Sequence, residues 1–222
     1  MTKNNAVITF IKSPEKGRVK TRLAKSVGEN AALVLYQCFV MDVLDMVRAT
    51  PWALRVYHYP EKSGRRIRSW LGNDLDLFPQ AGTTLGDKMK HALAETFAAG
   101  YERAVLIGSD LPDLPSEIID TAFNSLNSTD AVIGPSPDGG YYLIGFTAKG
   151  FVPRIFNNIP WGTHRVFDLT LNNFSDHGVS PVCLPVWRDI DTKVDLQALG
   201  LEPSSGPAMH TTRYLKKKGL TC

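Results

Sequence analysis

A short apolar run near the beginning of the chain leads directly into a loop with a high density of positive charge. Residues 6–11 are apolar and partly β-branched, a pattern typical of a buried parallel strand. The fourteen residues that follow contain one acid, Glu15, and six cations: Lys12, Lys16, Arg18, Lys20, Arg22 and Lys25. Open α/β sheets bind ligands beyond the carboxyl ends of their strands, so this loop predicts an anion site, with phosphate or diphosphate as the usual ligand. The alternative is a solvated surface loop.

Strand-like and helix-like segments alternate along the rest of the chain, which predicts an α/β fold with a largely parallel sheet. Predicted strands cover residues 6–11, 54–59, 75–78, 104–107, 131–134, 141–146 and 181–186. Predicted helices cover residues 28–49, 63–71, 84–99, 115–126, 163–174 and 194–199. The strand at 141–146 returns after a short turn, so we expect it to be antiparallel. We expect one domain over residues 1–202 and a basic, loosely held tail over residues 203–222.

The charges of the chain nearly balance, and the positive excess is local. The formal net charge is +3 over 222 residues, with cations concentrated in the first loop and the C-terminal tail. This distribution favours a small anionic ligand and argues against a nucleic-acid partner. The sequence shows no signal-peptide pattern and no stretch of membrane-spanning length, and its three cysteines lack metal-binding spacing. We therefore expect a cytoplasmic protein without a membrane span. Its oligomeric state is left open.

An acid follows the buried strand predicted at 104–107. Asp110 lies just past the end of that strand, where a carboxylate can reach a divalent cation without entering the core. Mg²⁺ is often held by one or two carboxylates together with substrate phosphates, so we predict Asp110 as a metal ligand. A turn or helix-capping residue is the alternative. For Asp113 we expect either a supporting role at the site or a cap of the next helix.

Two consecutive glycines separate the strands predicted at 131–134 and 141–146. Asp138 precedes Gly139 and Gly140, and Asp-Gly is a common signal for a hairpin turn. Glycine backbone also lets a ligand approach closely, and Asp138 can accept hydrogen bonds from sugar hydroxyls. Tyr141 and Tyr142 point to opposite faces of their strand, so we expect one to line a pocket and the other to pack in the core.

A further pair of acids precedes the last predicted helix of the domain. Asp189 and Asp191 fall on one side of the chain if the segment is extended, which makes a second metal ligand available. Asp191 and Thr192 also stand in good positions to cap the helix, and this structural role is the alternative. Residues 161–163, Trp-Gly-Thr, are either part of a pocket wall or ordinary packing.

In their order along the chain, these motifs resemble one family. The segments that carry the resemblance are residues 12–23, 107–114, 134–145, 160–162 and 189–196, and it extends from about residue 7 to residue 199. The chain resembles the DUF2064 group of glycosyltransferase-like proteins. The resemblance implies the nucleotide-diphospho-sugar transferase superfamily and the A-type glycosyltransferase fold, a three-layer α/β/α arrangement with a mostly parallel sheet. Glycosyltransferases of this fold commonly carry Asp-x-Asp. Here Gly108 and Ser109 precede Asp110, so only Asp110 carries over.

The resemblance and the residues together lead us to expect a metal-dependent transferase. Its donor would be a nucleotide-diphosphate sugar and its acceptor a small molecule, with Mg²⁺ or Mn²⁺ held by Asp110 and Asp191. Asp138 and Asp113 are the candidates for the catalytic base that takes a proton from the acceptor. The residues expected to bind the nucleotide are Lys12, Gly17, Arg18, Lys20, Arg22, Gly139, Gly140 and Tyr141.

Two other functions remain open from the sequence. A nucleotidyltransferase would use the same cationic loop and strand-end acid, couple a nucleoside triphosphate to a small phosphorylated or sugar substrate, and release pyrophosphate. A non-catalytic nucleotide-binding protein of the same fold would bind its ligand without needing the metal.

Overall fold

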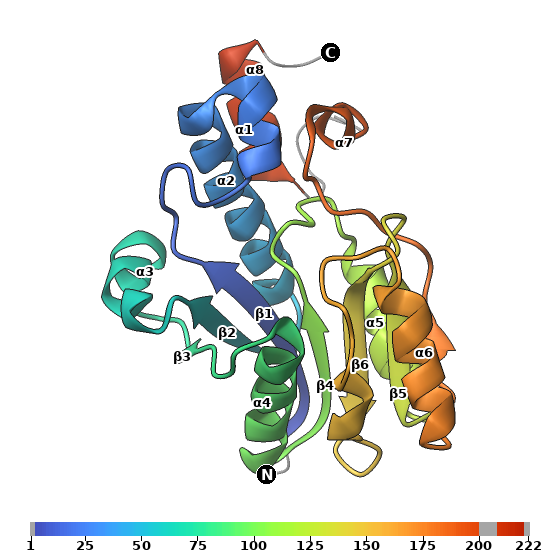
Figure 1. Ribbon diagram of the computed structural model, residues 1–222. Helices are drawn as coiled ribbons and strands as arrows, with labels where there is room; N and C mark the ends of the chain where they lie inside the picture. The colour runs from blue at the N-terminus through green and yellow to red at the C-terminus, as the bar shows by residue number, and fades with distance from the viewer. Residues whose placement is uncertain (1–2, 200–207, 220–222) are drawn as a thin grey trace.

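The computed structural model describes residues 3–199 and 208–219. A seven-stranded sheet forms its centre (Figure 1). The strands are β1 (Lys3–Lys12), β2 (Ala53–Tyr59), β3 (Leu77–Pro79), β4 (Tyr101–Ile107), β5 (Ala131–Pro135), β6 (Tyr141–Thr147) and β7 (Val182–Cys183). The α-helices are α1 (Thr21–Val27), α2 (Glu29–Arg48), α3 (Gly64–Leu71), α4 (Leu85–Ala98), α5 (Ser116–Ser125), α6 (Val166–Asp176), α7 (Lys193–Gln197) and α8 (Met209–Lys218). Short 3₁₀ turns, η1 (Glu61–Ser63) and η2 (Pro153–Phe156), complete the described elements.

The strand order of the sheet brings the loops after β1 and β4 together. The order is β3-β2-β1-β4-β6-β5-β7. β6 pairs antiparallel with both β4 and β5, as predicted, and the other pairings are parallel. In the β1–β4 pair Thr9 lies opposite Ile107, so both strands end at the same edge of the sheet. The basic loop and the loop that carries Asp110 are therefore neighbours.

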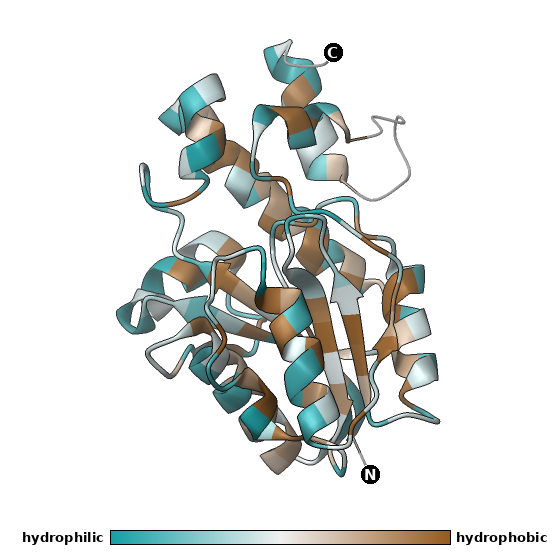
Figure 2. Cartoon of the chain, turned by 45° about the vertical axis from the view of Figure 1, so that its right-hand side comes forward, coloured by the Kyte–Doolittle hydropathy of each residue, from teal (hydrophilic) through white to brown (hydrophobic). Residues whose placement is uncertain are grey.

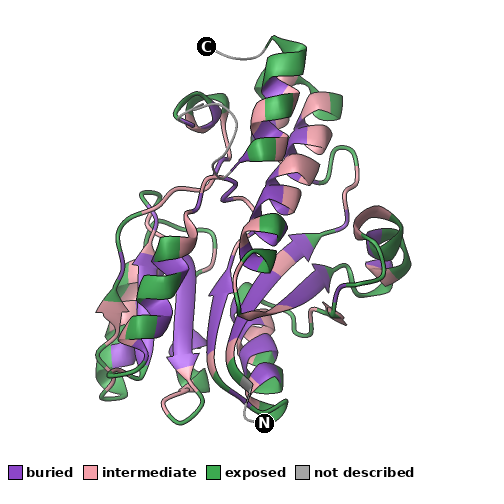
Figure 3. Ribbon diagram, turned by 180° about the vertical axis from the view of Figure 1, so that it is seen from behind, coloured by how far each residue is buried: buried purple, intermediate pink, exposed green. Residues whose placement is uncertain are grey.

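Helices cover both faces of the sheet, which confirms the expected α/β fold in three layers. α4 and α6 lie on the near face in Figure 1, and α2 and α5 lie behind it. Alternating strand residues feed the two cores: Val7 packs with α2 and α5, and the next residue, Ile8, packs with α4 and α6. Figure 2 shows the strands as the most apolar part of the chain, and Figure 3 shows them buried between the helices.

Helix α2 is the longest helix of the described chain and agrees with the prediction at 28–49. Its length and apolar composition would also suit a membrane-crossing helix, and it is the single described helix of which this is true. Half of that apolar stretch is buried inside the protein, and α2 packs against the sheet, α1 and α8. Packing in the core is therefore sufficient to explain its apolar character.

Three segments differ from the sequence predictions. The second half of the basic loop forms helix α1, which starts directly after Lys20. The strand predicted at 181–186 is reduced to Val182–Cys183. The tail expected to be loosely held contains α8, whose Leu215 is buried in an apolar cluster with α1 and α2. The buried residues of α8, Thr211 and Leu215, lie four positions apart and therefore share one face of the helix. The proposed boundary at residue 202 lies outside the described residues.

The carboxylate of Asp42 in α2 holds the first turn of α8. It accepts hydrogen bonds from the backbone N–H groups of His210 and Thr211, at 2.7 and 3.0 Å, and from the hydroxyl of Thr211 at 2.6 Å. A helix start lacks internal partners for its first N–H groups, so Asp42 acts as a cap supplied by another helix.

We expect Asp42→Ala to lower the free energy of unfolding by about 1–3 kcal/mol, because buried N–H groups of α8 lose their acceptor. Urea denaturation followed by circular dichroism measures this change. Asp45→Ala is the control, since Asp45 binds His210 one turn along α2 at the surface, and it should cost less than about 1 kcal/mol. Equal losses in the two variants would contradict the capping role.

Candidate functional site

A cleft of about 870 Å³ opens where β1 and β4 end. Its walls come from the basic loop, the loop after β4, the turn before β6, the start of α4 and the segment before α6. Of the residues expected to bind the nucleotide, metal or acceptor, those that line it are Lys12, Lys20, Arg22, Asp110, Asp138, Gly140, Tyr141 and Asp191. The position of the cleft agrees with the expectation that ligands bind beyond the carboxyl ends of parallel strands.

The ammonium group of Lys20 lies at the centre of the charged part of the cleft. Its Nζ is 2.8 Å from Oδ2 of Asp110 and 2.8 Å from Oδ1 of Asp191, and its side chain is only 3% exposed. Burial alone would lower the pKa of Lys20, but the two carboxylates outweigh it and raise the pKa, so the ammonium stays charged. Lys20 also has a left-handed backbone (φ 47°), which is uncommon for a residue other than glycine.

Asp191 faces the cleft because another residue caps α7. The side chain of Thr192 accepts from the N–H of Asp195, and Asp195 in turn accepts from the N–H of Thr192, which forms a capping box. The carboxylate of Asp191 is thus free of the capping role and binds Lys20 and, at 3.4 Å, Arg22. Burial raises the pKa of Asp191, but Lys20, Arg22 and Lys12 outweigh this and hold the pKa below its usual range.

Asp189 is the third acid of this cluster. Burial, and then the negative charges of Asp110 and Asp191, raise its pKa to about 7, although Lys20 acts in the opposite direction. The sequence analysis named Asp189 only as a possible partner of Asp191. Like Asp191, it lines the cleft.

The acids of the cleft are suited to a hard divalent cation that they would share with the phosphate oxygens of a bound ligand. Among the residues that the structure describes, no three His, Cys, Asp or Glu side chains converge closely enough to form a metal site by themselves. Oδ1 of Asp110, however, is buried and has no hydrogen-bond partner. Carboxylate oxygens are preferred ligands of Mg²⁺ and Mn²⁺, and Mg²⁺ often uses only one or two of them plus phosphate oxygens. Asp110 and Asp191 therefore fit such an ion.

The turn from Asp138 to Gly140 is tight, and it fixes one wall of the cleft. Oδ1 of Asp138 accepts from the N–H of Gly140 at 3.0 Å. Gly139 has a left-handed backbone (φ 86°), and a Cβ built there would lie 2.1 Å from the carbonyl oxygen of His164. The carbonyl of Gly139 accepts from the N–H of Phe167, which joins this turn to the first turn of α6. Gly139 is thus needed for packing, while Gly140 and Asp138 face the cleft.

Tyr141 and Tyr142 pack in different cores and so point to opposite faces of β6, as expected, but both line the cleft, whereas only one was expected to do so. The ring of Tyr141 packs edge-on against Trp161, with 6.4 Å between the ring centroids, and both residues line the cleft. The hydroxyl of Tyr142 donates to the carbonyl of Pro185 at 2.9 Å within the other core. The Trp-Gly-Thr segment at 161–163 is therefore part of the pocket wall, one of the two roles that the sequence left open.

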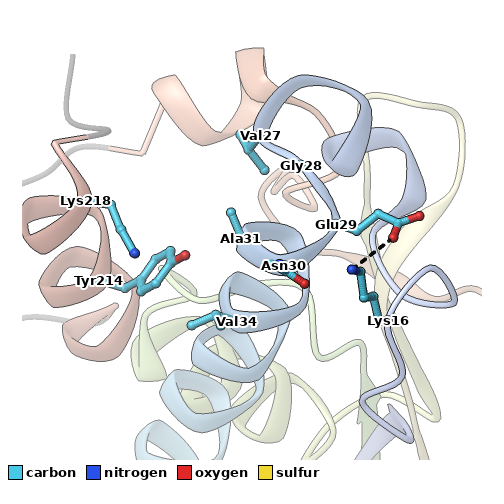
Figure 4. A pocket seen from close by; sticks show the side chains of 9 residues that line it. All are labelled: Lys16, Val27, Gly28, Glu29, Asn30, Ala31, Val34, Tyr214 and Lys218. Atoms are coloured by element: carbon cyan, nitrogen blue, oxygen red, sulfur yellow. Dashed lines mark ion pairs between the residues drawn. The ribbon is translucent and has the colours of Figure 1, made fainter.

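Two predicted nucleotide-binding residues of the basic loop, Gly17 and Arg18, do not line the cleft. The guanidinium of Arg18 is largely exposed and pairs with Glu15 at 3.5 Å. Gly17 lies beside Glu29 at the start of α2. Their neighbour Lys16 pairs with Glu29 at 3.7 Å and lines a separate pocket of about 610 Å³ between α2 and α8, as Figure 4 shows. The loop thus divides its cations between two surfaces.

Asp113 is also directed away from the cleft. Its carboxylate accepts from the indole N–H of Trp187 at 3.2 Å and lies 3.7 Å from the guanidinium of Arg188. Asp113 does not line the cleft, and α5 begins after Pro115 without a side-chain cap, so of the two expected roles its contacts match the supporting one. Asp113 ties the loop after β4 to the segment that leads to Asp189.

Some residues of the cleft were missed by sequence reasoning. The hydroxyl of Tyr36 accepts from the N–H of Lys12 at 2.6 Å and donates to its carbonyl at 3.0 Å, which fixes the end of β1. The ammonium of Lys88 lies 3.8 Å from the centre of the Tyr59 ring. Tyr36 and Lys88 belong to helices whose spacing indicates only an amphipathic pattern, so no local signal distinguishes them from core or surface residues.

Gly139→Ala should disrupt this wall of the cleft, because a methyl group would collide with the backbone of His164. We expect a loss of unfolding free energy above about 2 kcal/mol, measured by urea denaturation. Gly72→Ala is the matched control: its φ is 89°, but nothing lies within 4 Å of its Cβ, so it should show only the conformational cost of about 1–2 kcal/mol. Equal effects of the two substitutions would count against the collision.

The raised pKa of Asp189 predicts a pH-dependent stability. The Asp189 carboxyl group releases its proton at about pH 4 in the unfolded chain, whereas in the folded protein it keeps the proton until about pH 7. Stability contributed by the protonated group is therefore complete below about pH 4 and is lost as the pH rises to about 7.

Asp189→Asn removes this titration. In buffer with EDTA, wild type should lose stability between about pH 4 and about pH 7, whereas the variant should not. The melting temperature of the variant minus that of wild type should therefore increase over this range and stay constant above it. Asp176→Asn, at an exposed position of α6, serves as the control and should show no such trend. A constant difference for Asp189→Asn across this range would refute the raised pKa.

One solved structure is similar to this chain over nearly its whole length. It comes from Desulfovibrio desulfuricans G20 and is provisionally named a nucleotide-diphospho-sugar transferase. The two sequences are 36% identical, the match covers 99% of this chain and 96% of that chain, and the TM-score is 0.90. No curated protein matches this chain.

More distant solved structures share the fold alone. The inositol-1-phosphate CTP transferase from T. maritima is 14% identical, with 97% of each chain covered and a TM-score of 0.57. The 4-diphosphocytidyl-2C-methyl-D-erythritol synthase from Anaerococcus prevotii DSM 20548 is 15% identical, with 97% of this chain and 99% of that chain covered and a TM-score of 0.55. The nucleotide-diphospho-sugar transferase fold is thereby confirmed. The chain belongs to the family described as uncharacterized proteins conserved in bacteria (DUF2064), which it matches over residues 43–163.

Proposed function

We propose that this protein is a cytoplasmic, metal-dependent transferase that passes a glycosyl group from a nucleotide-diphosphate sugar to a small acceptor. The observation that carries this proposal is the buried Lys20 ammonium between Asp110 and Asp191, in a cleft at the carboxyl ends of β1 and β4. The name of the similar Desulfovibrio protein, a nucleotide-diphospho-sugar transferase, supports the same donor class.

The cations of the cleft would bind the diphosphate of the donor. Lys12, Lys20 and Arg22 line the side next to β1 and α1, and Lys88 reaches the cleft from α4. Their charges would stabilise the nucleoside diphosphate as it leaves. Asp110 and Asp191 would hold Mg²⁺ or Mn²⁺, and the ion would supply further neutralisation of the leaving diphosphate.

Asp138 is the candidate base on the acceptor side. It lines the cleft from the turn before β6, and the structure assigns it no ion pair within the described residues. One of its oxygens is fixed by the N–H of Gly140, which orients the carboxylate. A carboxylate held in this way could accept the proton of an acceptor hydroxyl. Asp113 is the weaker candidate, because its carboxylate lies outside the cleft and already accepts a hydrogen bond from Trp187 and pairs with Arg188.

A thermal-shift panel of nucleoside diphosphates, their sugar conjugates and nucleoside triphosphates, each with and without Mn²⁺, tests this function. A ligand present at about 100 times its dissociation constant should add about 2.7 kcal/mol of stability. We expect a shift with one nucleoside diphosphate or its sugar that depends on the metal.

Asp110→Asn should abolish the metal-dependent part of the shift, whereas Asp113→Asn, in the same loop but outside the cleft, should retain it. Analysis of the products then decides the reaction. Release of a nucleoside diphosphate would support glycosyl transfer. Release of pyrophosphate from a nucleoside triphosphate would contradict glycosyl transfer and indicate nucleotidyl transfer. Binding without metal and without turnover would indicate a binding protein.

A further inference from the structure

A side chain of the protein occupies the position between the two carboxylates that fit a metal ion. Lys20 Nζ lies at 2.8 Å from one oxygen of each, and its own side chain is nearly inaccessible to solvent. A cation of the chain itself therefore bridges the two carboxylates. Any divalent ion that binds Asp110 and Asp191 has to compete with this ammonium.

We propose that Lys20 is an internal counter-ion that holds the metal position and leaves it when a diphosphate binds. Metal alone would then bind weakly, because an ion that takes the position between the two carboxylates displaces the ammonium and leaves it buried without these partners. A diphosphate that enters with the metal gives Lys20 a new anionic partner. Metal and diphosphate would thus bind cooperatively. This inference rests on the proposed function, whose metal site it uses.

The surrounding charges explain why this cluster of acids needs such a counter-ion. Asp110, Asp189 and Asp191 lie close enough that their negative charges influence one another. Arg22 and Lys12 also act on Asp191, but Arg22 is mostly exposed and lies 3.4 Å from Asp191, so solvent screens much of its effect. Lys20 therefore supplies most of the buried positive charge that holds these acids together.

Two features indicate that the arrangement around Lys20 can change. Oδ1 of Asp110 is buried without a partner, so Lys20 satisfies only one of the two oxygens of that carboxylate. Lys20 also stands at the joint between the basic loop and α1, with a left-handed backbone that a lysine rarely adopts. A flexible four-carbon side chain at this joint has other anions within its reach once a diphosphate fills the cleft.

The direct test is the affinity of the full chain for Mn²⁺ alone, measured by the electron paramagnetic resonance signal of free Mn²⁺. Lys20→Met should bind Mn²⁺ at least about tenfold more tightly than wild type, since the competing charge-assisted contacts are removed. Arg22→Met is the charge-matched control, because it also removes one positive charge beside Asp191. It should change the affinity much less. If Lys20→Met bound Mn²⁺ no more tightly than wild type or Arg22→Met, the inference would be overturned.

Thermal shifts with preformed Mn²⁺–pyrophosphate test the cooperative part. In wild type, the complex should raise the melting temperature far more than Mn²⁺ alone does. In Lys20→Met, Mn²⁺ alone should already give most of the increase. A wild-type protein that is stabilised equally by Mn²⁺ with and without pyrophosphate would contradict the displacement of Lys20.

The substitution could leave the acids without compensation and unfold the chain. Addition of Mn²⁺ alone should then restore the far-ultraviolet circular dichroism of Lys20→Met, and failure of this rescue would overturn the inference. Failure of the proposed function gives a different result. Tight Mn²⁺ binding by Lys20→Met, together with no response of wild type to any nucleotide sugar, would support the inference about Lys20 and contradict the proposed donor.

Discussion

The ion pairs of Lys20 connect three segments that are far apart in the sequence. Lys20 begins α1, Asp110 follows β4, and Asp191 precedes α7. A buried ammonium with fewer partners would carry a large desolvation cost. The two ion pairs offset this cost and thereby couple the positions of the three segments. The charged end of the cleft is thus one unit, built by a single side chain and two carboxylates from loops that the sheet brings to one edge.

An apolar cluster packs next to these charged residues and fixes the segments that carry them. Leu23 of α1, Phe39 of α2 and Ile190, which lies between the two acids before α7, pack together with Leu215 of α8. The ring of Phe39 lies 5.7 Å from the ammonium of Lys20, so the same residue supports both the apolar cluster and the charge. The C-terminal helix is therefore part of the framework that positions the site, although none of its described residues lines the main cleft.

Several parts of the site could be read from local patterns. Asp110 was identified because an acid follows a buried strand, and Gly140 and Tyr141 because a tight turn precedes the next strand. The roles of Asp113 and Arg18 were not accessible in this way. Each lies only a few residues from a cleft residue, and its direction depends on partners elsewhere: Trp187 and Arg188 for Asp113, and Glu15 at the loop surface for Arg18.

The α/β fold, the antiparallel strand and the edge of the sheet where charged residues gather could all be predicted from the amino-acid sequence. These follow from hydrophobic periodicity, turn residues and strand ends, which are properties of neighbours along the chain. Three features became visible only in the folded chain: which cations enter the cleft, the bridge that Lys20 forms between two acids, and the packing of α8 against α2. Those outcomes depend on burial and on charge pairs between distant segments, and no local pattern encodes the distance between two side chains that meet only after folding.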